Sequence, residues 1–308
     1  MRDLISVIMS CYNEELDWIE QSIESILNQT YKNIEFIIIC DNPENYEIKE
    51  LLLKYKEKDN RIILILNEKN LGLVESLNKG LLKCTGNYIA RMDADDISNI
   101  SRLEKQLKYF KQNTNIDLIM SATNYIDEKG KFIKSSNIIK SDDIKKMLLY
   151  GNISTHPTWM FKREILQKVG KYNNVIYVED YDFLCRTILL GYNVGFINEY
   201  LLDYRVRNNG ITKSKRAEQE YIYQIVNNNY RRAIKGKKYD LLRDLNNIDN
   251  KKMNNYIVSN EKFQEGKNLI SNKNYIKGIK ILLIETIKSS TKRKQMINYF
   301  ILKIISIK

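Results

Sequence analysis

Residues 88–96 of the chain read YIARMDADD. A short apolar segment here runs directly into three carboxylates within four residues, those of Asp93, Asp95 and Asp96. Because like charges repel, a strand that ends this way needs a positive partner. Hard divalent cations bind carboxylate and phosphate oxygens together, so a cation that bridges a diphosphate would meet this need. The alternative is a solvated acidic turn before a helix, where Asp is favourable in any case.

The order of elements around this segment predicts an α/β fold with a Rossmann-like, mostly parallel sheet. Short apolar runs predict buried strands at residues 4–9, 34–40, 62–66, 88–92 and 116–120. Segments with apolar side chains at helical spacing separate these runs, and such alternation forms βαβ units. Ligands bind at the carboxyl ends of the strands in sheets of this kind. Ser10, Asp41 and Asp93 each stand at such an end.

The second half of the chain is less regular. Its pattern predicts a hairpin at residues 125–133, a strand at 155–161, a helix at 180–190, late strands at 194–197 and 201–206, and helices from residue 215. We therefore expect a catalytic domain over residues 1–212, with halves at 1–122 and 123–212. A helical C-terminal appendage follows at residues 213–308.

The net charge of +12 is concentrated in the predicted appendage. Residues 1–212 hold 28 Lys and Arg against 30 Asp and Glu, a balance of −2, whereas residues 213–308 hold 22 against 8, a balance of +14. Such a region could meet an anionic membrane, an acidic partner or nucleic acid. The alternative is an ordinary solvated helical surface.

The four cysteines are widely spaced and include no C-x-x-C pair. They predict buried free thiols in a reducing compartment. The first apolar run is too short for a signal peptide, and no apolar run approaches the roughly 20 residues that span a bilayer. We expect a cytoplasmic protein that could lie on the inner face of the membrane.

Several motifs, in this order, resemble the family 2 glycosyltransferases of the GT-A fold, in particular bacterial enzymes that build capsule or lipopolysaccharide glycans. The resemblance covers about residues 4–212. The matching segments are residues 6–14, 25–31, 41–43, 70–72 with 77–80, 91–96, and 156–158 with 179–182.

The resemblance implies a donor site for a nucleotide-sugar. It places Asp95 as a direct ligand of Mn²⁺ or Mg²⁺, and Asp93 on the metal, on a metal-bound water or on the ribose. Asp41 can accept the imide N–H of a uracil ring on which Tyr12 stacks; alternatively, Asp41 caps the next helix. Arg91 neutralises the carboxylates or reaches a phosphate. The remaining implied donor-side residues are Ser10, Asn13, Glu14, Asn70 and Asn78.

The acceptor half carries the implied catalytic base, Asp180. An acceptor hydroxyl has too high a pKa to attack unaided and needs a carboxylate to take its proton. Glu179 and Asp182 flank this base, and these acids would also suit a helix N-terminus. His156, the single histidine of the chain, is expected to line the acceptor side rather than to act in catalysis.

Two departures from the family pattern qualify the donor site. Many relatives carry a His shortly after the Tyr-Arg of the late strand, whereas residues 204–209 here read YRVRNN, with Arg207 in that region. No third metal ligand is therefore assigned, and Arg207 could contact the diphosphate. Asn42-Pro43-Glu44 replaces the usual Asp-Gly-Ser, which weakens the preference for uridine. The processive signature Q-x-x-R-W is absent, which favours single-sugar transfer.

The expected function is inverting, metal-dependent transfer of one sugar, from a UDP-hexose or UDP-N-acetylhexosamine to a hydroxyl of a glycan or polyprenyl-diphosphate-linked acceptor. Two enzyme classes fit less well. A haloacid-dehalogenase-like phosphatase carries its D-x-D on the first strand, and a nucleotidyltransferase has a Gly-rich basic loop after that strand. A catalytically silent adaptor, whose basic tail binds a membrane or nucleic acid, stays open.

The tail is expected to hold the enzyme at a membrane. Residues 292–305 join a basic cluster to an apolar stretch that is too short to span, a combination typical of helices that lie in the interface. Packing back onto the enzyme and a homodimer contact are the alternatives.

Overall fold

The computed structural model describes residues 3–139, 143–207, 215–288, 293–294, 297–298, 301–302 and 304–305. The chain forms two compact units. The first comprises Met1–Ile144, Ser154–Val175 and Glu179–Asn208, and the second comprises Lys145–Ile153, Ile176–Val178 and Asn209–Lys308. The expected boundary at residue 212 lies outside the described residues. The second unit also includes two short segments from the range that we expected to form the acceptor half.

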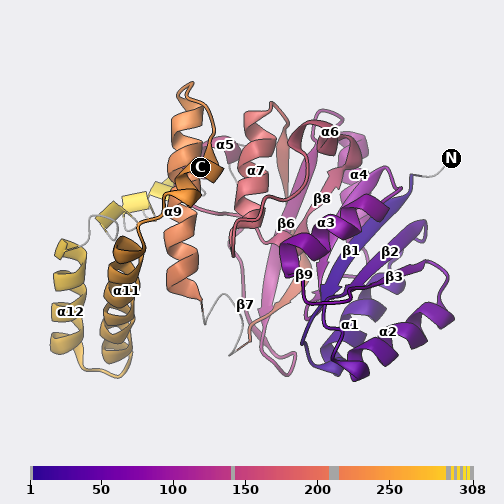
Figure 1. Ribbon diagram of the computed structural model, residues 1–308, viewed down its shortest axis with the longest axis horizontal. Coiled ribbons are helices and arrows are strands. Elements are labelled where there is room, and N and C mark those ends of the chain that lie inside the picture. Colours follow the sequence, from indigo (N-terminus) through magenta and orange to yellow (C-terminus); the bar gives the residue numbers. More distant parts are fainter. Residues whose placement is uncertain are drawn as a thin grey trace. The chain divides into compact units, whose positions relative to one another are not determined.

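The described part of the first unit is built on one nine-stranded sheet in the order β3-β2-β1-β4-β8-β6-β9-β5, with β7 paired to β6 (Figure 1). The run from β3 to β4 is parallel, as is the pair β6–β9. The other pairs are antiparallel, and β8 separates the two parallel parts. The strands are β1 (Ile5–Cys11), β2 (Ile34–Cys40), β3 (Ile62–Leu66), β4 (Tyr88–Asp93), β5 (Ile97–Ser98), β6 (Leu118–Ile126), β7 (Phe132–Ser135), β8 (Met160–Lys162) and β9 (Val194–Arg205).

Helices cover both faces of this sheet. Apolar side chains of α1, α2 and α4 form one buried cluster with Val7 of β1 and Phe36 of β2. Helix α3 lies on the opposite face, where a Cβ on Gly80 would be 2.8 Å from Cγ2 of Ile8. The helices of this unit are α1 (Leu16–Leu27), α2 (Tyr46–Lys58), α3 (Leu73–Lys83), α4 (Arg102–Gln112), α6 (Leu166–Val169), α7 (Glu179–Leu189) and the 3₁₀ turns η1 (His156–Thr158) and η2 (Arg163–Ile165). Helix α5 (Ile144–Met147) contains the point at which the chain passes from the first unit to the second, between Ile144 and Lys145.

The predicted α/β fold is confirmed, and the strands expected at residues 4–9, 34–40, 62–66 and 88–92 are present. The expected hairpin is β6–β7, with Gly130 in its turn at a φ of +80°. The strand predicted at 155–161 is wrong in its first half, which forms η1, and only Met160–Lys162 pairs as β8. Pro157 explains the error, because proline lacks the N–H that a central strand needs.

The late strands at 194–197 and 201–206 are one strand, β9, which keeps its pairing with β6 through register shifts. The strand expected at 116–120 begins at Leu118 and continues to Ile126. The four cysteines are buried and free, as predicted.

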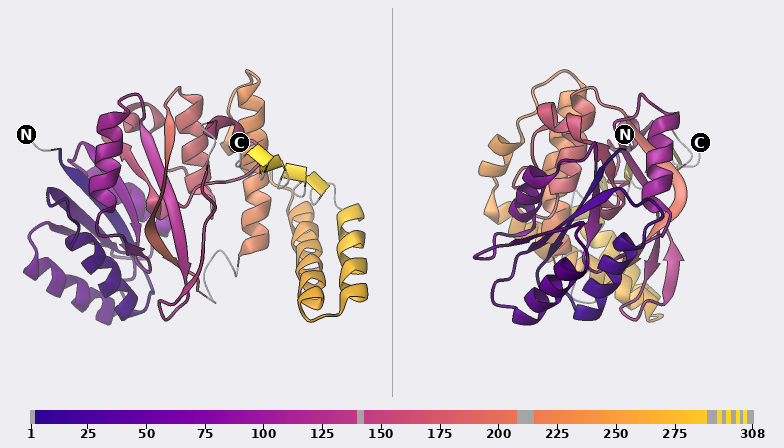
Figure 2. Two further views of the ribbon diagram at one scale, coloured as in Figure 1. Left: turned by 180° about the vertical axis from the view of Figure 1, so that it is seen from behind. Right: turned by 90° about the vertical axis from the view of Figure 1, so that its right-hand side faces the viewer.

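The second unit is helical in its described residues. Its helices are α9 (Arg216–Ile234), α10 (Leu241–Asn246), α11 (Asn250–Ser271) and α12 (Tyr275–Lys288). Helices α11 and α12 lie side by side as a hairpin (Figures 1 and 2). Two glycines allow this close approach, because a Cβ on Gly278 would lie 2.7 Å from the carbonyl oxygen of Gly266. None of the helices in the described residues is both long enough and apolar enough to cross a membrane.

Candidate active site

The polar side chains that follow the first strands meet at one edge of the sheet. Ser10, near the end of β1, pairs in register with Asp93 at the end of β4. The backbone N–H of Asp41, the residue after β2, donates to the carbonyl of Cys11 across 2.8 Å. The donor-side residues of the first, second and fourth strands are therefore neighbours, as parallel pairing requires.

The carboxylate turn, residues 93–96, gathers three acids. One carboxylate oxygen each from Asp93, Asp95 and Asp96 lies within 4.8 Å of the others. Burial and the charge of Asp93 raise the pKa of Asp95 to about 7. Burial and the charges of Asp95 and Asp93 raise the pKa of Asp96 well above its usual range. The turn therefore concentrates negative charge that its surroundings do not fully offset.

These acids fit a divalent metal ion. Asp96 is fully buried, and its Oδ2 has no hydrogen-bond partner among the described residues. An all-carboxylate set of oxygens suits Mg²⁺ or Mn²⁺. The chemistry of the donor set and the unpaired oxygen thus support divalent metal use here.

Arg205 holds the carboxylate turn in place. Its backbone N–H donates to Asp96 Oδ1 and its Nε donates to the carbonyl of Asp95, both at 2.8 Å. Its other nitrogens bind the carbonyls of Asp127 and Glu128 and the Gln21 side chain. We did not single out Arg205 from the sequence, although it stands in the quoted Tyr-Arg of the late motif.

Arg91 is an internal counter-charge. It is 2% exposed, and its Nη2 donates to Asp93 Oδ1 at 2.5 Å while its Nη1 donates to the carbonyl of Ile8. We considered two roles for Arg91: neutralising the carboxylates or reaching a phosphate. Its burial and its contact with Asp93 support the first.

Arg207 contacts the same turn, and its side chain is partly exposed. Its Nε is 2.7 Å from Asp95 Oδ2, and its Nη1 is 4.0 Å from Glu14 Oε1. The other oxygen of Glu14 accepts the backbone N–H groups of Tyr12 and Asn13 at 2.7 and 3.2 Å. Glu14 thus orders the loop after β1, and Tyr12 stays 45% exposed. The motif residues Asn208 and Asn209 lie outside the described residues.

Asp41 is bonded to the loop before α3. Its Oδ1 accepts from Asn67 Nδ2 at 2.7 Å and from the N–H of Leu71 at 2.9 Å, and its Oδ2 accepts from the N–H of Gly72 at 2.8 Å. Asn70 also accepts from Gly72 N–H, at 2.9 Å. Helix α2 is instead capped by Asn45, which accepts from Ile48 N–H. Asp41 therefore does not cap the helix that follows it in sequence.

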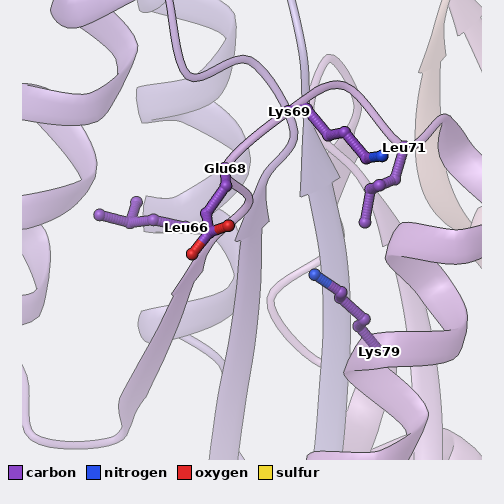
Figure 3. A pocket seen from close by; sticks show the side chains of 5 residues that line it. All are labelled: Leu66, Glu68, Lys69, Leu71 and Lys79. Carbon is purple, nitrogen blue, oxygen red and sulfur yellow. The ribbon is translucent and has the colours of Figure 1, made fainter.

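A pocket of about 510 Å³ opens at the carboxyl end of β3, next to this network. Lys79 extends from α3 toward the loop that carries Lys69 and Leu71 (Figure 3). The Lys79 ammonium donates to Asn67 Oδ1 at 2.9 Å, and Asn67 in turn donates to Asp41. We missed Asn67 in the sequence, because an Asn after a strand is typical of any turn.

The acceptor-side acids begin helix α7. Asp180 is partly exposed, and its Oδ1 accepts from the N–H of Tyr181 at 2.6 Å. Burial and the charge of Asp180 raise the pKa of Glu179 to about 8, and Arg91 and Asp93 also act on this group. Glu179 is therefore mostly neutral at pH 7. Because the charges of Arg91 and Asp93 act on its pKa, Glu179 is electrostatically linked to the carboxylate turn.

Asp182 and Asn78 are bonded within the protein. Asp182 is fully buried and accepts from Arg186 Nε at 2.9 Å and from Asn173 Nδ2 at 3.0 Å. Asn78 exchanges two hydrogen bonds of 3.0 Å with the backbone of Tyr172. These contacts join α7 and α3 to the loop around Tyr172. They leave little of either side chain for a ligand.

His156 lies in an aromatic cluster. Its Nε2 is 2.9 Å from the hydroxyl of Tyr172, and its ring packs edge-on against Trp159. Burial and the charge of Arg91 hold the pKa of His156 well below its usual range, so the ring is neutral. Tyr172, which joins His156 to the Asn78 contact, carried no sequence signal that we used.

An α/β sheet with a cluster of acids at the carboxyl ends of its strands is typical of enzymes that bind a phosphorylated ligand together with a divalent cation. Residues 6–170 match the family model Glycosyl transferase family 2, and the chain belongs to this family. It is 41% identical over 228 residues to an uncharacterized glycosyltransferase of Methanocaldococcus jannaschii, covering 73% of this chain and 79% of that protein. It is 38% identical over 220 residues to the O-antigen biosynthesis glycosyltransferase WbnJ of Escherichia coli, covering 71% and 85%. The protein is therefore a glycosyltransferase. This favours the interpretation as an active enzyme over that as a catalytically silent adaptor.

Solved structures show the same fold. The S. aureus TarS fragment 1–349 in complex with UDP-GlcNAc matches with a TM-score of 0.60 at 17% identity, over 72% of this chain and 65% of that one. The mannosyltransferase PcManGT of Pyrobaculum calidifontis, in complex with GDP-Man and Mn²⁺, matches with a TM-score of 0.59 at 17% identity, over 77% and 66%. The chain thus spans just under two thirds of each solved chain. The predicted GT-A fold is confirmed.

Proposed function

We propose that this enzyme transfers a single sugar from a nucleotide-sugar to a hydroxyl of a glycan or polyprenyl-diphosphate-linked acceptor, with metal dependence and inversion at the anomeric carbon. The observation that carries the proposal is the convergence of Asp93, Asp95 and Asp96 within 4.8 Å at the edge where Ser10 and Asp41 also lie. A divalent cation held at such a site can stabilise the charge that develops on a diphosphate leaving group.

The donor's diphosphate is proposed to lie over the carboxylate turn. Asp95 and Asp93 would hold a Mn²⁺ or Mg²⁺ ion, which when bound stabilises negative charge on the leaving group. Arg91 orients the Asp93 carboxylate and offsets its charge through their 2.5 Å contact. Arg205 fixes the backbone of the turn, so the two carboxylates are positioned before the donor arrives.

The nucleoside is proposed to bind beside the loop that Asp41 holds, with Tyr12, Asn13 and Asn70 around it. Among the described residues, Asp41 Oδ2 makes one hydrogen bond, to Gly72. It therefore retains a lone pair for one further donor, such as the imide N–H of uracil. This supports a UDP-hexose or UDP-N-acetylhexosamine donor. The two related folds were solved with UDP-GlcNAc and with GDP-Man, so guanosine is the competing nucleotide.

Asp180 is proposed as the general base. It is partly exposed, whereas Glu179 is buried with a raised pKa and Asp182 is paired with Arg186. Of these three acids, Asp180 is the one that is partly exposed. A single base together with a leaving group on the opposite side favours direct displacement and hence inversion. His156 and Glu179 would line the acceptor side.

The acceptor is proposed to be a surface-polysaccharide intermediate at a membrane. The E. coli relative is named for O-antigen biosynthesis, and such glycans grow on lipid carriers. The exposed residues Ile276, Ile279, Leu283 and Ile287 form a stripe along α12, and the exposed Lys277 and Lys280 accompany it. A basic helix with such a stripe suits the surface of an anionic membrane. The end at residues 292–305, which we expected to make this contact, lies mostly outside the described residues.

A panel of nucleotide-sugars tests the donor proposal. Each is incubated with the enzyme and Mn²⁺ or Mg²⁺, and release of the nucleoside diphosphate is followed, with Asp95→Ala as the matched control. We expect turnover of a uridine sugar that Asp95→Ala and EDTA both abolish. Turnover of GDP-sugars alone would contradict the role of Asp41 but not the metal site.

A further inference from the structure

Four arginines surround the carboxylate turn, and one differs from the others. Arg91, Arg102 and Arg205 are at most 2% exposed, and they bind backbone carbonyls of the surrounding loops and strands. The side chain of Arg207 is 28% exposed, and its closest ion pair is with Asp95 at 2.7 Å. Its second pairing, with Glu14, spans 4.0 Å and is correspondingly weak. Arg207 is thus the arginine of this group that can leave its position at low cost.

The partner of Arg207 is also a carboxylate that a metal would use. Arg207 Nε donates to Oδ2 of Asp95, whose side chain is 11% exposed. A divalent cation attracted to Asp95 would meet the guanidinium on that oxygen, and two cations at one carboxylate repel each other. Metal binding therefore requires Arg207 to weaken or break this contact.

We propose that Arg207 is an exchangeable counter-cation: it pairs with Asp95 in the free enzyme, yields that carboxylate to the metal, and then pairs with the donor's diphosphate. The inference rests on the proposed metal-dependent function and adds the step that couples metal to donor. A guanidinium is suited to the second partner because its planar N–H groups match phosphate oxygens. Glu14, bonded to the loop after β1, stays beside the displaced side chain.

The exchange predicts a specific linkage. Metal alone binds weakly because it must displace Arg207 without giving the guanidinium a new partner. Metal and nucleoside diphosphate together bind more tightly, because the diphosphate provides that partner. By linkage, each ligand raises the affinity of the other by the same factor. Part of this coupling depends on Arg207 and disappears when the guanidinium is removed.

Calorimetry on the full chain measures both the affinity for metal alone and the coupling between metal and nucleotide. Mn²⁺ is titrated alone and with saturating UDP, and again with GDP, into wild type, Arg207→Ala and Arg207→Gln. Arg61→Ala is the matched control, since Arg61 also pairs with a carboxylate, Asp59 at 2.6 Å, away from the turn. We expect Arg207→Ala and Arg207→Gln to bind Mn²⁺ alone about tenfold more tightly, the scale of one charge-assisted hydrogen bond. We also expect the nucleotide to enhance Mn²⁺ affinity about tenfold less than in wild type.

The two parts of the result separate exchange from simpler roles. If Arg207 contacted the diphosphate whether or not Mn²⁺ is bound, its removal would lower nucleotide affinity equally with and without Mn²⁺ and would leave the coupling unchanged. If Arg207 only stabilised the loop, its removal would not tighten Mn²⁺ binding. Either result overturns the proposal while leaving metal-dependent transfer intact. Absence of Mn²⁺ binding in all variants, with transfer that persists in EDTA, would instead overturn both.

Discussion

The backbone N–H of Arg205 donates to Oδ1 of Asp96 across 2.8 Å and joins the end of β9 to the turn after β4. The two residues are 109 positions apart in the chain. This contact and the Nε bond to the Asp95 carbonyl orient the acids before any ligand binds. Preorganisation of this kind is the main contribution a protein makes to charge stabilisation.

Arg205→Lys should destabilise the protein and loosen the metal site. Lysine keeps the charge, but it cannot reach the carbonyls of Asp95, Asp127 and Glu128 and the Gln21 side chain together. Buried acceptors left without a donor cost roughly 2–4 kcal/mol of unfolding free energy in total. Urea denaturation measures this loss. Arg216→Lys is the control, because Arg216 is 53% exposed in its pair with Glu220, and it should change stability by less than about 0.5 kcal/mol. Equal effects of the two changes would contradict the role of Arg205.

Asp180→Asn should abolish transfer while nucleotide affinity stays nearly unchanged. The amide keeps the size of the side chain but cannot accept the acceptor's proton, and loss of a general base slows reactions about 10²–10⁴-fold. Glu179→Gln is the matched control, because Glu179 with its pKa of about 8 is already neutral at pH 7. That variant should retain most of its rate at pH 7. If Asp180→Asn stayed active and Glu179→Gln did not, the base would be Glu179.

The pH dependence of stability should report the burial of Glu179. An unfolded glutamate titrates near 4.3, whereas the pKa of Glu179 in the folded protein is raised to about 8. Between these values the folded state binds one more proton than the unfolded state, so this group's contribution to stability is present at low pH and is lost as pH rises toward 8. The slope is at most about 1.4 kcal/mol per pH unit.

Thermal melts of wild type and Glu179→Gln between pH 5 and 8.5 test this slope. The glutamine removes the proton uptake at this position, while Asp95 and Asp96 titrate in both proteins. The melting temperature of the variant should therefore rise relative to wild type as pH increases. Parallel curves would show that Glu179 titrates as an exposed acid.

The stripe on α12 should bind anionic vesicles. Intact protein is expected to float with phosphatidylglycerol-containing liposomes and to lose binding at high salt, because each Lys near the surface adds about 1 kcal/mol. Ile276→Asp with Leu283→Asp should abolish flotation, whereas Leu82→Asp should not, although Leu82 on α3 is 85% exposed. Deleting residues 290–308 tests the end of the chain separately. Dimers that dissociate in the double variant, without any flotation of wild type, would assign the stripe to a second copy instead.

Much of the fold could be predicted from the sequence, because strands buried on both faces read as short apolar runs between helical segments. The alternation also placed Asp41 and Asp93 at one edge without further information. The prediction failed where a single residue overrides a local pattern: Pro157 converts the first half of the strand predicted at 155–161 to a 3₁₀ turn. We also predicted β9 as two separate strands. The strand continues through the register shifts in its pairing with β6, and no local sequence pattern indicates this.

The site was less predictable than the fold. Residue types and spacing identified the carboxylate turn. They did not show which polar side chains use their hydrogen bonds within the protein and so are not left for a ligand. Asn78 and Asp182 have the residue types of ligand-binding groups, yet their hydrogen bonds go to Tyr172, Asn173 and Arg186. Arg205 was missed for the converse reason: its importance comes from contacts with chain segments far away in sequence.

The central claim is that the carboxylate turn supports metal-dependent transfer with inversion, and donor hydrolysis followed by proton NMR tests it most directly. Water serves as the acceptor, so no knowledge of the natural glycan is needed, and Mg²⁺ is used because paramagnetic Mn²⁺ would broaden the signals. With an α-linked UDP-sugar, we predict that the first sugar released is the β anomer, before mutarotation, and that EDTA or Asp95→Ala stops its release. Initial release of the α anomer, or undiminished release in EDTA, would contradict the account.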